Sequence, residues 1–222
     1  MMFKVCKILN GCFHSFRTRL LMSLLTIMSL SQGGFAQNWD VQLLRDINLH
    51  RNKDFDPLYR HISNSVLPLT LGLPLGVIVY EQSSGGGVGS KKRGLEMFAV
   101  TVGTVALSQG IKWTLNRERP YEKYPEIDPV YLAADPSFPS GHTASAFALA
   151  TSATLIWPKW YVAVPAYTWA GSVAYSRMHL GLHYPSDVVA GAVLGGGTAY
   201  LCHYLNPKLF RKKKDTVLQT FR

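Results

Sequence analysis

Two histidines whose neighbours favour acid–base or nucleophilic chemistry stand in the second half of this 222-residue chain. His183 is followed four residues later by Asp187, so both side chains would lie on one face at the start of a helix. A carboxylate in that position holds the imidazole in one tautomer and stabilises its cationic form. His142 ends the tetrapeptide Pro-Ser-Gly-His just before an apolar stretch, and it supplies a second group for proton transfer.

Three fixed cations accompany these histidines, and as a set they suit a phosphate. Lys112 and Arg119 are seven residues apart, close to two helical turns, so the spacing predicts that they share a helix face. Arg177 adds a second guanidinium, whose planar fork matches phosphate oxygens. Ser140 and Gly141 offer a hydroxyl group and backbone amides at a helix start, where anions bind readily.

These groups are the ones that phosphoryl transfer needs: charge neutralisation, a nucleophile and a proton for the leaving oxygen. His183, oriented by Asp187, is the candidate nucleophile and would form a phosphohistidine. His142 would protonate the leaving group and then act as the base toward water. Because the fixed cations supply the electrostatic stabilisation, we expect neither a metal ion nor another cofactor.

Apolar runs separate the polar segments and predict that helices position them. The runs cover about 62–80, 95–113, 143–157, 161–174 and 188–204. At 14 to 19 residues each, some are marginal for a hydrocarbon layer about 30 Å thick, and Pro68 and Pro74 should kink the first. Three such runs could form a soluble bundle, but five are hard to bury within a chain of this length. Gly195–Gly197, inside the last run, predicts close helix packing and not a phosphate loop.

Residues 1–36 have the pattern of a signal peptide or of a first membrane helix. Basic residues without acids precede an apolar stretch at 20–30, and the small residues Gly34 and Ala36 fit a signal-peptidase site before Gln37. We expect cleavage there, and an uncleaved segment would add a sixth span to the five. On either interpretation, the chain that follows is directed across the membrane.

The remaining chain divides by composition. Residues 37–61 are amphipathic and balanced in charge, so we expect short helices in the periplasm, with a plain linker as an equal alternative. Residues 62–206 would form the membrane domain that carries the motifs. Residues 207–222 would form a basic tail in the cytoplasm.

Loop charges predict which side of the membrane carries the motifs. Basic residues gather in three places: 91–93, Lys159 and 208–214. Because cytoplasmic loops are enriched in lysine and arginine, these places would be cytoplasmic, and the acid-containing loop 114–142 would be periplasmic. The loop 175–187 falls on the same side, so all three motifs would meet at one membrane face. Arg117 belongs to no motif and is interpreted as an anchor or a solvated charge.

With three motifs in order, the sequence resembles the type 2 phosphatidic acid phosphatase superfamily, which shares a core with vanadium haloperoxidases and class A acid phosphatases. The family pattern Lys-x6-Arg-Pro, Pro-Ser-Gly-His and Ser-Arg-x5-His-x3-Asp stands complete here at 112–120, 139–142 and 176–187. The resemblance covers about residues 62–205 and implies a helical bundle, a metal-free phosphohistidine mechanism and the residue roles given above. Integral members usually have six spans, which this chain reaches only if residues 1–36 stay attached.

We therefore predict an all-α integral membrane phosphatase with five or six spans in a bacterial inner membrane, its active site facing the periplasm. The substrate would be a lipid phosphate monoester or diphosphate, such as undecaprenyl diphosphate, a lipid A phosphate, phosphatidylglycerophosphate or phosphatidic acid. The alternatives are a lipid-to-lipid phosphotransferase, a soluble secreted acid phosphatase, a vanadium haloperoxidase and a lipid-binding protein with an inactive site. The net charge of +10 suits an anionic membrane or substrate, and without a basic stripe interleaved with aromatics we expect no nucleic acid.

Overall fold

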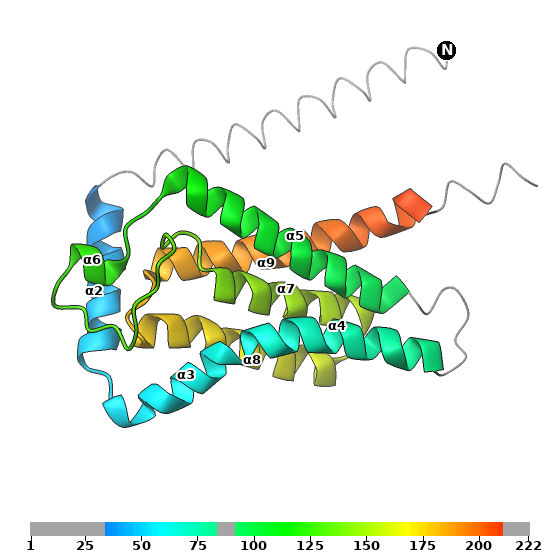
Figure 1. The fold of residues 1–222 in the computed structure, drawn as a ribbon, viewed down its shortest axis with the longest axis horizontal. Helices are drawn as coiled ribbons and strands as arrows, with labels where there is room; N and C mark the ends of the chain where they lie inside the picture. Colours follow the sequence, from blue (N-terminus) through cyan, green and yellow to red (C-terminus); the bar gives the residue numbers. More distant parts are fainter. Residues whose placement is uncertain (1–33, 84–91, 211–222) are drawn as a thin grey trace, which may run out of the picture. The chain divides into compact units, whose positions relative to one another are not determined.

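The computed structural model describes residues 34–83 and 92–210. Within these ranges every regular element is helical, which confirms the all-α prediction (Figure 1). The elements are α2 (Gly34–Leu49), η1 (Lys53–Phe55), α3 (Asp56–Asn64), α4 (Val66–Ser83), α5 (Lys92–Leu115), α6 (Pro120–Lys123), α7 (Gly141–Ile156), α8 (Trp160–His179) and α9 (Pro185–Phe210). The chain divides into two units, residues 1–42 and 43–222, and the helical bundle belongs to the second. The predictions for residues 1–36 and 207–222 fall mostly outside the described ranges and stay predictions.

The amphipathic segment 37–61 contributes to α2, η1 and α3, and it is therefore not a plain linker. Each of the five apolar runs lies within one long helix or, for the first run, within α3 and α4. The break between α3 and α4 falls at Ser65, where the ring of Pro68 would clash with the carbonyl group of Asn64 in a continuous helix. Pro74 lies inside α4, which continues to Ser83.

Helix α7 lies at the centre of the bundle and packs against α4, α5, α8 and α9. Its buried residues are alanine, serine, threonine and one leucine, and such small side chains let neighbouring helices approach closely. The approach is closest to α9, because a Cβ atom at Gly195 would lie 2.0 Å from the carbonyl oxygen of Ala144. The close packing predicted from the glycine run is therefore confirmed at Gly195.

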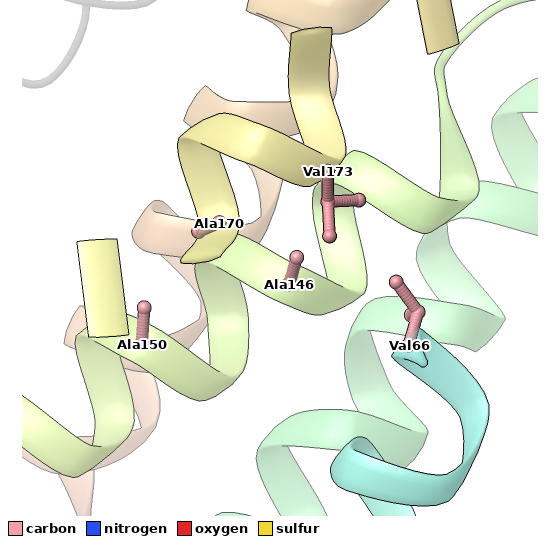
Figure 2. Packing of buried hydrophobic residues seen from close by; sticks show 5 residues of the cluster. All are labelled: Val66, Ala146, Ala150, Ala170 and Val173. Atoms are coloured by element: carbon pink, nitrogen blue, oxygen red, sulfur yellow. The ribbon is translucent and has the colours of Figure 1, made fainter. Parts of the chain in front are cut away.

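A small apolar cluster joins the central helix α7 to α4 and α8 (Figure 2). Its buried members are Val66, Ala146, Ala150, Ala170 and Val173. The indole N–H of Trp169 donates a hydrogen bond to Ser65 Oγ at 3.0 Å, which ties α8 to the break between α3 and α4. In a bilayer the competing surroundings are lipid tails, so close packing, and not removal from water, is what stabilises such a cluster.

Three helical segments of the described chain are long and apolar enough to cross a membrane: Lys53–Ser83, Arg93–Lys123 and Pro185–Leu205. The central helix α7 has only 16 residues, and α8 contains Pro165. Because α7 is surrounded by other helices, its outer surface does not need the apolar character of a lipid-facing helix. The chain is thus a helical membrane protein, while the count of five or six spans stays a prediction.

All three motifs lie at one end of the bundle. Lys112 is near the end of α5, His142 is at the start of α7, and Asp187 is in the first turn of α9. Arg93 at the start of α5 and Lys159 after the end of α7 lie at the opposite end. Arg93 and Lys159 are therefore separated from the motifs by the length of the helices, as predicted from the loop charges.

Candidate active site

A cavity with a volume of about 380 Å³ lies at the motif end of the bundle, and all three motifs contribute to its wall. The predicted site residues that line it are Lys112, Arg119, Gly141, His142, Arg177 and His183. Asp187 is fully buried behind His183. Ser140, the N-cap of α7, is also fully buried, and its hydroxyl accepts a hydrogen bond from Thr143 at 3.0 Å. The structure thus gathers the eight predicted residues, while their catalytic and phosphate-binding roles stay predictions.

A tight turn after α8 delivers His183 to the cavity. The backbone N–H of Leu182 donates to the carbonyl of Arg177 at 3.1 Å, and that of Gly181 donates to Met178 at 2.9 Å. This pair of bonds is the Schellman pattern, which requires a left-handed residue after the helix. Gly181 has a φ of 70°, a conformation that glycine adopts without steric cost. The turn therefore fixes where the chain leaves α8 and where the imidazole begins.

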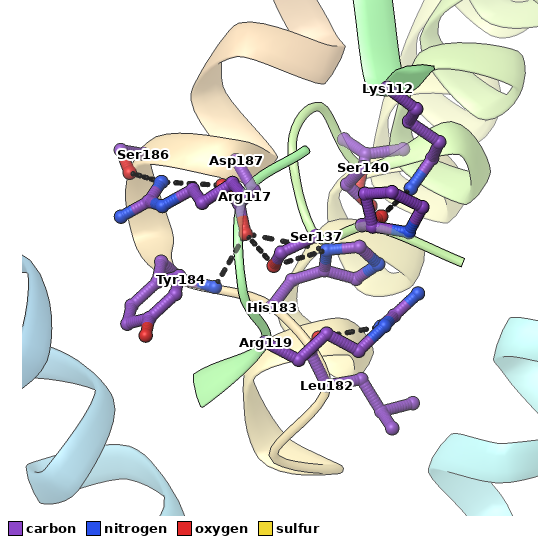
Figure 3. Close-up of polar contacts among 12 residues, drawn as sticks. Lys112, Arg117, Arg119, Ser137, Ser140, Leu182, His183, Tyr184, Ser186 and Asp187 are labelled. Carbon is purple, nitrogen blue, oxygen red and sulfur yellow. Dashed lines mark hydrogen bonds and ion pairs between the residues drawn. The ribbon is translucent and has the colours of Figure 1, made fainter. Parts of the chain in front are cut away.

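Asp187 orients the His183 ring from the first turn of α9 (Figure 3). One of its carboxylate oxygens accepts hydrogen bonds from Ser137 Oγ and from the backbone N–H of Tyr184, the latter at 3.0 Å. The same oxygen lies 3.4 Å from Nδ1 of His183. Because Nδ1 faces the carboxylate, Nε2 is the ring nitrogen that faces the cavity.

Both site histidines are held in the neutral state. Burial is the main cause that lowers the pKa of His183 from its ordinary value of 6.5 to about 3; the hydrogen bond to Asp187 opposes this shift, and the positive charge of Arg177 adds to it. Burial, together with the charge of Arg177, also lowers the pKa of His142 to about 3. A neutral imidazole has the lone pair that nucleophilic attack requires. An anionic phosphate in the cavity would offset the cations and raise both pKa values, so His142 gains its acidic proton most readily as substrate binds.

Lys112 and Arg119 reach the cavity from different elements, which corrects the prediction that they share a helix face. Helix α5 ends at Leu115, and Asn116 takes up a left-handed φ of 42°. Asparagine tolerates this conformation better than most residues and commonly ends helices with it. Arg119 then lies in extended backbone as the N-cap of α6, directly before Pro120. The seven-residue spacing would place both cations on one face only if the helix continued.

Asp135 joins these two cations, a role that the sequence analysis missed. Its carboxylate oxygens lie 3.0 Å from Nζ of Lys112 and 2.7 Å from a guanidinium nitrogen of Arg119. Arg119 also donates from Nε to the backbone carbonyl of Asp135 at 2.8 Å, and Lys112 donates to the carbonyl of Pro136. Although partial burial alone would raise it, the charges and hydrogen bonds of the two cations lower the pKa of Asp135 to about 2. Its proximity to the Pro-Ser-Gly-His motif was the one available signal.

Two polar groups on the cavity wall have no hydrogen-bond partner among the described residues. One is Nε of Arg177, whose neighbouring NH1 group donates to Ser63 Oγ and to the hydroxyl of Tyr131. The other is the hydroxyl of Ser108, which lies one helical turn before Lys112. An unsatisfied buried donor costs about 1–3 kcal/mol. An anion that came within hydrogen-bond distance of either group would satisfy it.

Arg117 supports the other side of the Asp187 carboxylate, which corrects its interpretation as an anchor or a solvated charge. Its NH1 group donates to Asp187 Oδ1 at 2.5 Å and to Ser186 Oγ at 2.7 Å (Figure 3). Its guanidinium carbon lies 4.0 Å from the ring centroid of Tyr184. Arg117 therefore positions the carboxylate that positions His183. Among the described residues, no group of three or more His, Cys, Asp or Glu is placed to hold a metal ion.

Known proteins share this sequence over part of its length. The chain is 40% identical over 80 residues to a lipid A 4'-phosphatase from Bacteroides thetaiotaomicron, with 36% of each chain covered. It is 31% identical over 116 residues to an undecaprenyl-diphosphatase from Sulfolobus acidocaldarius, with 50% of this chain and 54% of the relative covered. The matched part thus spans between about a third and about half of these curated relatives.

Solved structures share the fold over most of the chain. The first transmembrane PAP2 type phosphatidylglycerolphosphate phosphatase from Bacillus subtilis superposes with a TM-score of 0.70 and 22% identity, covering 88% of this chain and 98% of that chain. The structure of Aquifex aeolicus LpxE gives 0.64 and 23% identity, with 72% and 92% covered. The sequence model of the PAP2 superfamily matches residues 93–211, which include all three motifs. This helical membrane protein therefore belongs to the PAP2 superfamily, as its three motifs predict.

Proposed function

We propose that this protein is a lipid phosphatase that hydrolyses a phosphate monoester or diphosphate through a phosphohistidine on His183. The observation that carries the proposal is one cavity lined by two imidazoles and three fixed cations. This set can bind a phosphate, attack it and protonate the leaving group without further components. The activities named for the curated relatives, a lipid A phosphatase and an undecaprenyl-diphosphatase, support the same reaction class.

In the first step, Nε2 of His183 would attack phosphorus while the bond from phosphorus to the leaving oxygen breaks. His142 would give its proton to that oxygen, so the lipid leaves as an alcohol or as a monophosphate. Asp187, 3.4 Å from Nδ1 of His183, would stabilise the positive charge that develops on the attacking ring. The three cations of the cavity would stabilise the negative charge on the phosphoryl oxygens.

In the second step, water would attack the phosphohistidine and break the bond between phosphorus and nitrogen. His142 is now neutral and would accept the proton from that water. Inorganic phosphate leaves, His183 is again neutral, and the proton on His142 is ready for the next leaving group. Both histidines thus return to the states that they have in the substrate complex, with His142 protonated and His183 neutral, and each turnover consumes one water molecule.

A lipid substrate fits the cavity better than a soluble one. Part of the cavity wall is apolar and comes from α4 and α5, with Val66, Leu67, Leu71 and Val105. Leu67 and Leu71 are 68% and 39% exposed, so on α4 they would contact lipid tails. A phosphate seat beside an apolar wall suits an amphiphile whose chains stay in the bilayer. This arrangement favours the lipid phosphatase over a secreted acid phosphatase.

We infer that the cavity faces the periplasm. Arg93 and Lys159 mark the opposite end of the helices, and basic residues are enriched on the cytoplasmic side of membrane proteins. The loop between α5 and α7 carries Glu118, Glu122 and Asp128 in addition to Asp135, which fits the external side. The inner membrane of a bacterium is the compartment that matches this orientation.

A panel of lipid phosphates tests the proposal. Purified protein in detergent should release phosphate from at least one lipid monoester or diphosphate, and His183→Ala should abolish release. The matched control is His203→Ala. It removes an imidazole that lies 2.7 Å from Glu96 and does not line the cavity, so the rate should stay unchanged. Activity should also persist in EDTA. If His183→Ala still released phosphate at the wild-type rate, the assignment of the nucleophile would be wrong. If the wild type released phosphate from no lipid, the proposed function would be wrong.

A further inference from the structure

A second cavity lies at the end of the bundle opposite the motifs. It has a volume of about 300 Å³ and follows the last turns of α4, near the start of α5 and the end of α7 (Figure 1). Its wall includes Glu81 from α4, Arg93 from α5 and Trp157, the C-cap of α7. Tryptophan is typical of the membrane–water interface, where lipid head groups lie. None of the residues that line this cavity belongs to the three motifs, so it is separate from the candidate active site.

The carboxyl group of Glu81 is buried in this wall without a partner. Glu81 is only 3% exposed, and neither of its side-chain oxygens has a hydrogen-bond partner among the described residues. Buried polar groups are normally hydrogen-bonded, because losing water without a replacement costs free energy. Since the group holds no bond where it lies, turning towards the cavity that it lines breaks none. The two oxygens therefore call for a ligand that brings hydrogen-bond donors.

Arg93 supplies the opposite charge in the same cavity. Its guanidinium is exposed and does not hydrogen-bond the carboxyl group of Glu81. A Cβ atom at Gly94 would lie 2.8 Å from the backbone nitrogen of Ile78 and 2.9 Å from the carbonyl oxygen of Pro74, so α5 begins directly against α4 and keeps Arg93 beside the cavity. A simple cation would be repelled by the arginine, and a simple anion by the carboxylate. A ligand that carries both charges suits both groups.

An apolar hollow continues from these charged groups along α4. Gly72 and Gly76, one helical turn apart, line the cavity, and a Cβ atom at either would have nothing within 4 Å. Leu73 and Val77 also line it, and Leu73 is 48% exposed. Because α4 belongs to a segment that is long and apolar enough to span the membrane, lipid chains are what would meet this surface. The cavity thus joins a place for a charged head group to a place for an acyl chain.

We propose that this cavity binds a zwitterionic phospholipid of the bilayer whose head group ends in a primary ammonium group. The ammonium N–H groups donate to Glu81, the phosphate accepts from Arg93, and one chain lies along the glycines of α4. A trimethylammonium head group carries the same charge but has no N–H donor, so it leaves the carboxyl oxygens unsatisfied. The bound lipid belongs to the leaflet opposite the candidate active site, and the inference does not depend on the proposed phosphatase activity.

The test titrates delipidated protein in detergent with dilauroylphosphatidylethanolamine and dilauroylphosphatidylcholine and follows bound lipid by native mass spectrometry. The two lipids share their chains, phosphate and net charge, so the contribution of Arg93 and of the apolar hollow cancels from their affinity ratio. The wild type should bind the primary ammonium lipid about tenfold more tightly, as one hydrogen bond to a charged group contributes. Glu81→Gln keeps the size of the side chain without its charge, and the ratio should fall below about threefold. Arg93→Gln should weaken both lipids and keep the ratio.

Glu96→Gln is the matched control, because it removes a carboxylate that lies 2.7 Å from His203 at the same end of the bundle and does not line the cavity. It should leave the affinity ratio unchanged. Equal binding of the two lipids by the wild type would overturn the proposal without any variant, since the carboxyl group would then select no donor. A preference that survives in Glu81→Gln would also overturn it, because the lipid would then be bound elsewhere. Should Glu81→Gln fail to fold, Glu81→Ala is measured in its place and the same loss of preference is expected.

Discussion

Arg117→Ala should lower kcat while leaving KM almost unchanged. The guanidinium bonds Asp187 at 2.5 Å, but it does not line the cavity, so its effect on the reaction must pass through Asp187 to His183. A hydrogen bond to a charged group contributes about 1.5–3 kcal/mol. The lower end applies, because the Arg117 side chain is 30% exposed and solvent screens the pair. A loss of about 1.5 kcal/mol from the transition state slows the chemical step about tenfold.

Phosphate release at saturating and at limiting lipid separates these two kinetic constants for Arg117→Ala. Lys123→Ala is the matched control, because it removes an exposed positive charge of the same loop. The Lys123 ammonium group lies over the ring of Tyr124 and not beside Asp187. Arg117→Lys keeps the charge but loses the planar fork, and it should recover part of kcat. A raised KM with an intact kcat in Arg117→Ala would show that Arg117 binds substrate, and the positioning argument would be wrong.

Two further predictions concern stability. The pKa of His183 is about 3 in the folded protein and 6.5 ordinarily, so the unfolded chain binds more protons between these values and stability should fall as pH is lowered through that window. Melting temperatures in detergent across this range check it, and His183→Asn should flatten the profile; an equally steep profile would contradict the assignment. Gly195→Ala should destabilise the fold by about 1–3 kcal/mol by overpacking, because its Cβ would lie 2.0 Å from the carbonyl of Ala144. Gly197→Ala, with nothing within 4 Å, is the control, and equal melting temperatures for the two variants would refute the packing argument.

What the sequence predicted well was local. An apolar run needs only its own composition to indicate a helix, and all five runs lie in helices. The pairing of His183 with Asp187 depends on a spacing of four residues at a helix start, and the structure places the two side chains 3.4 Å apart. The number of apolar runs then predicted which segments meet. Two runs separate the second motif from the third, so the chain crosses the bundle and returns to the same end.

What the sequence did not predict depends on contacts between distant segments or on one backbone angle. Arg117 meets Asp187 across 70 positions, and Asp135 meets Arg119 across 16, and neither pair follows from periodicity. The shared helix face of Lys112 and Arg119 was wrong because the backbone turns left-handed at Asn116. Such a turn is permitted but not required by asparagine, so only the folded loop decides it.

The covalent intermediate on His183 is the most direct test of the account. Purified protein mixed with a lipid substrate carrying a labelled phosphate is quenched in alkali, digested and sequenced by mass spectrometry. We predict that the label appears on His183 of the wild type and is absent from His183→Ala. Turnover by the wild type with the label on His142, or on no residue at all, would contradict the mechanism.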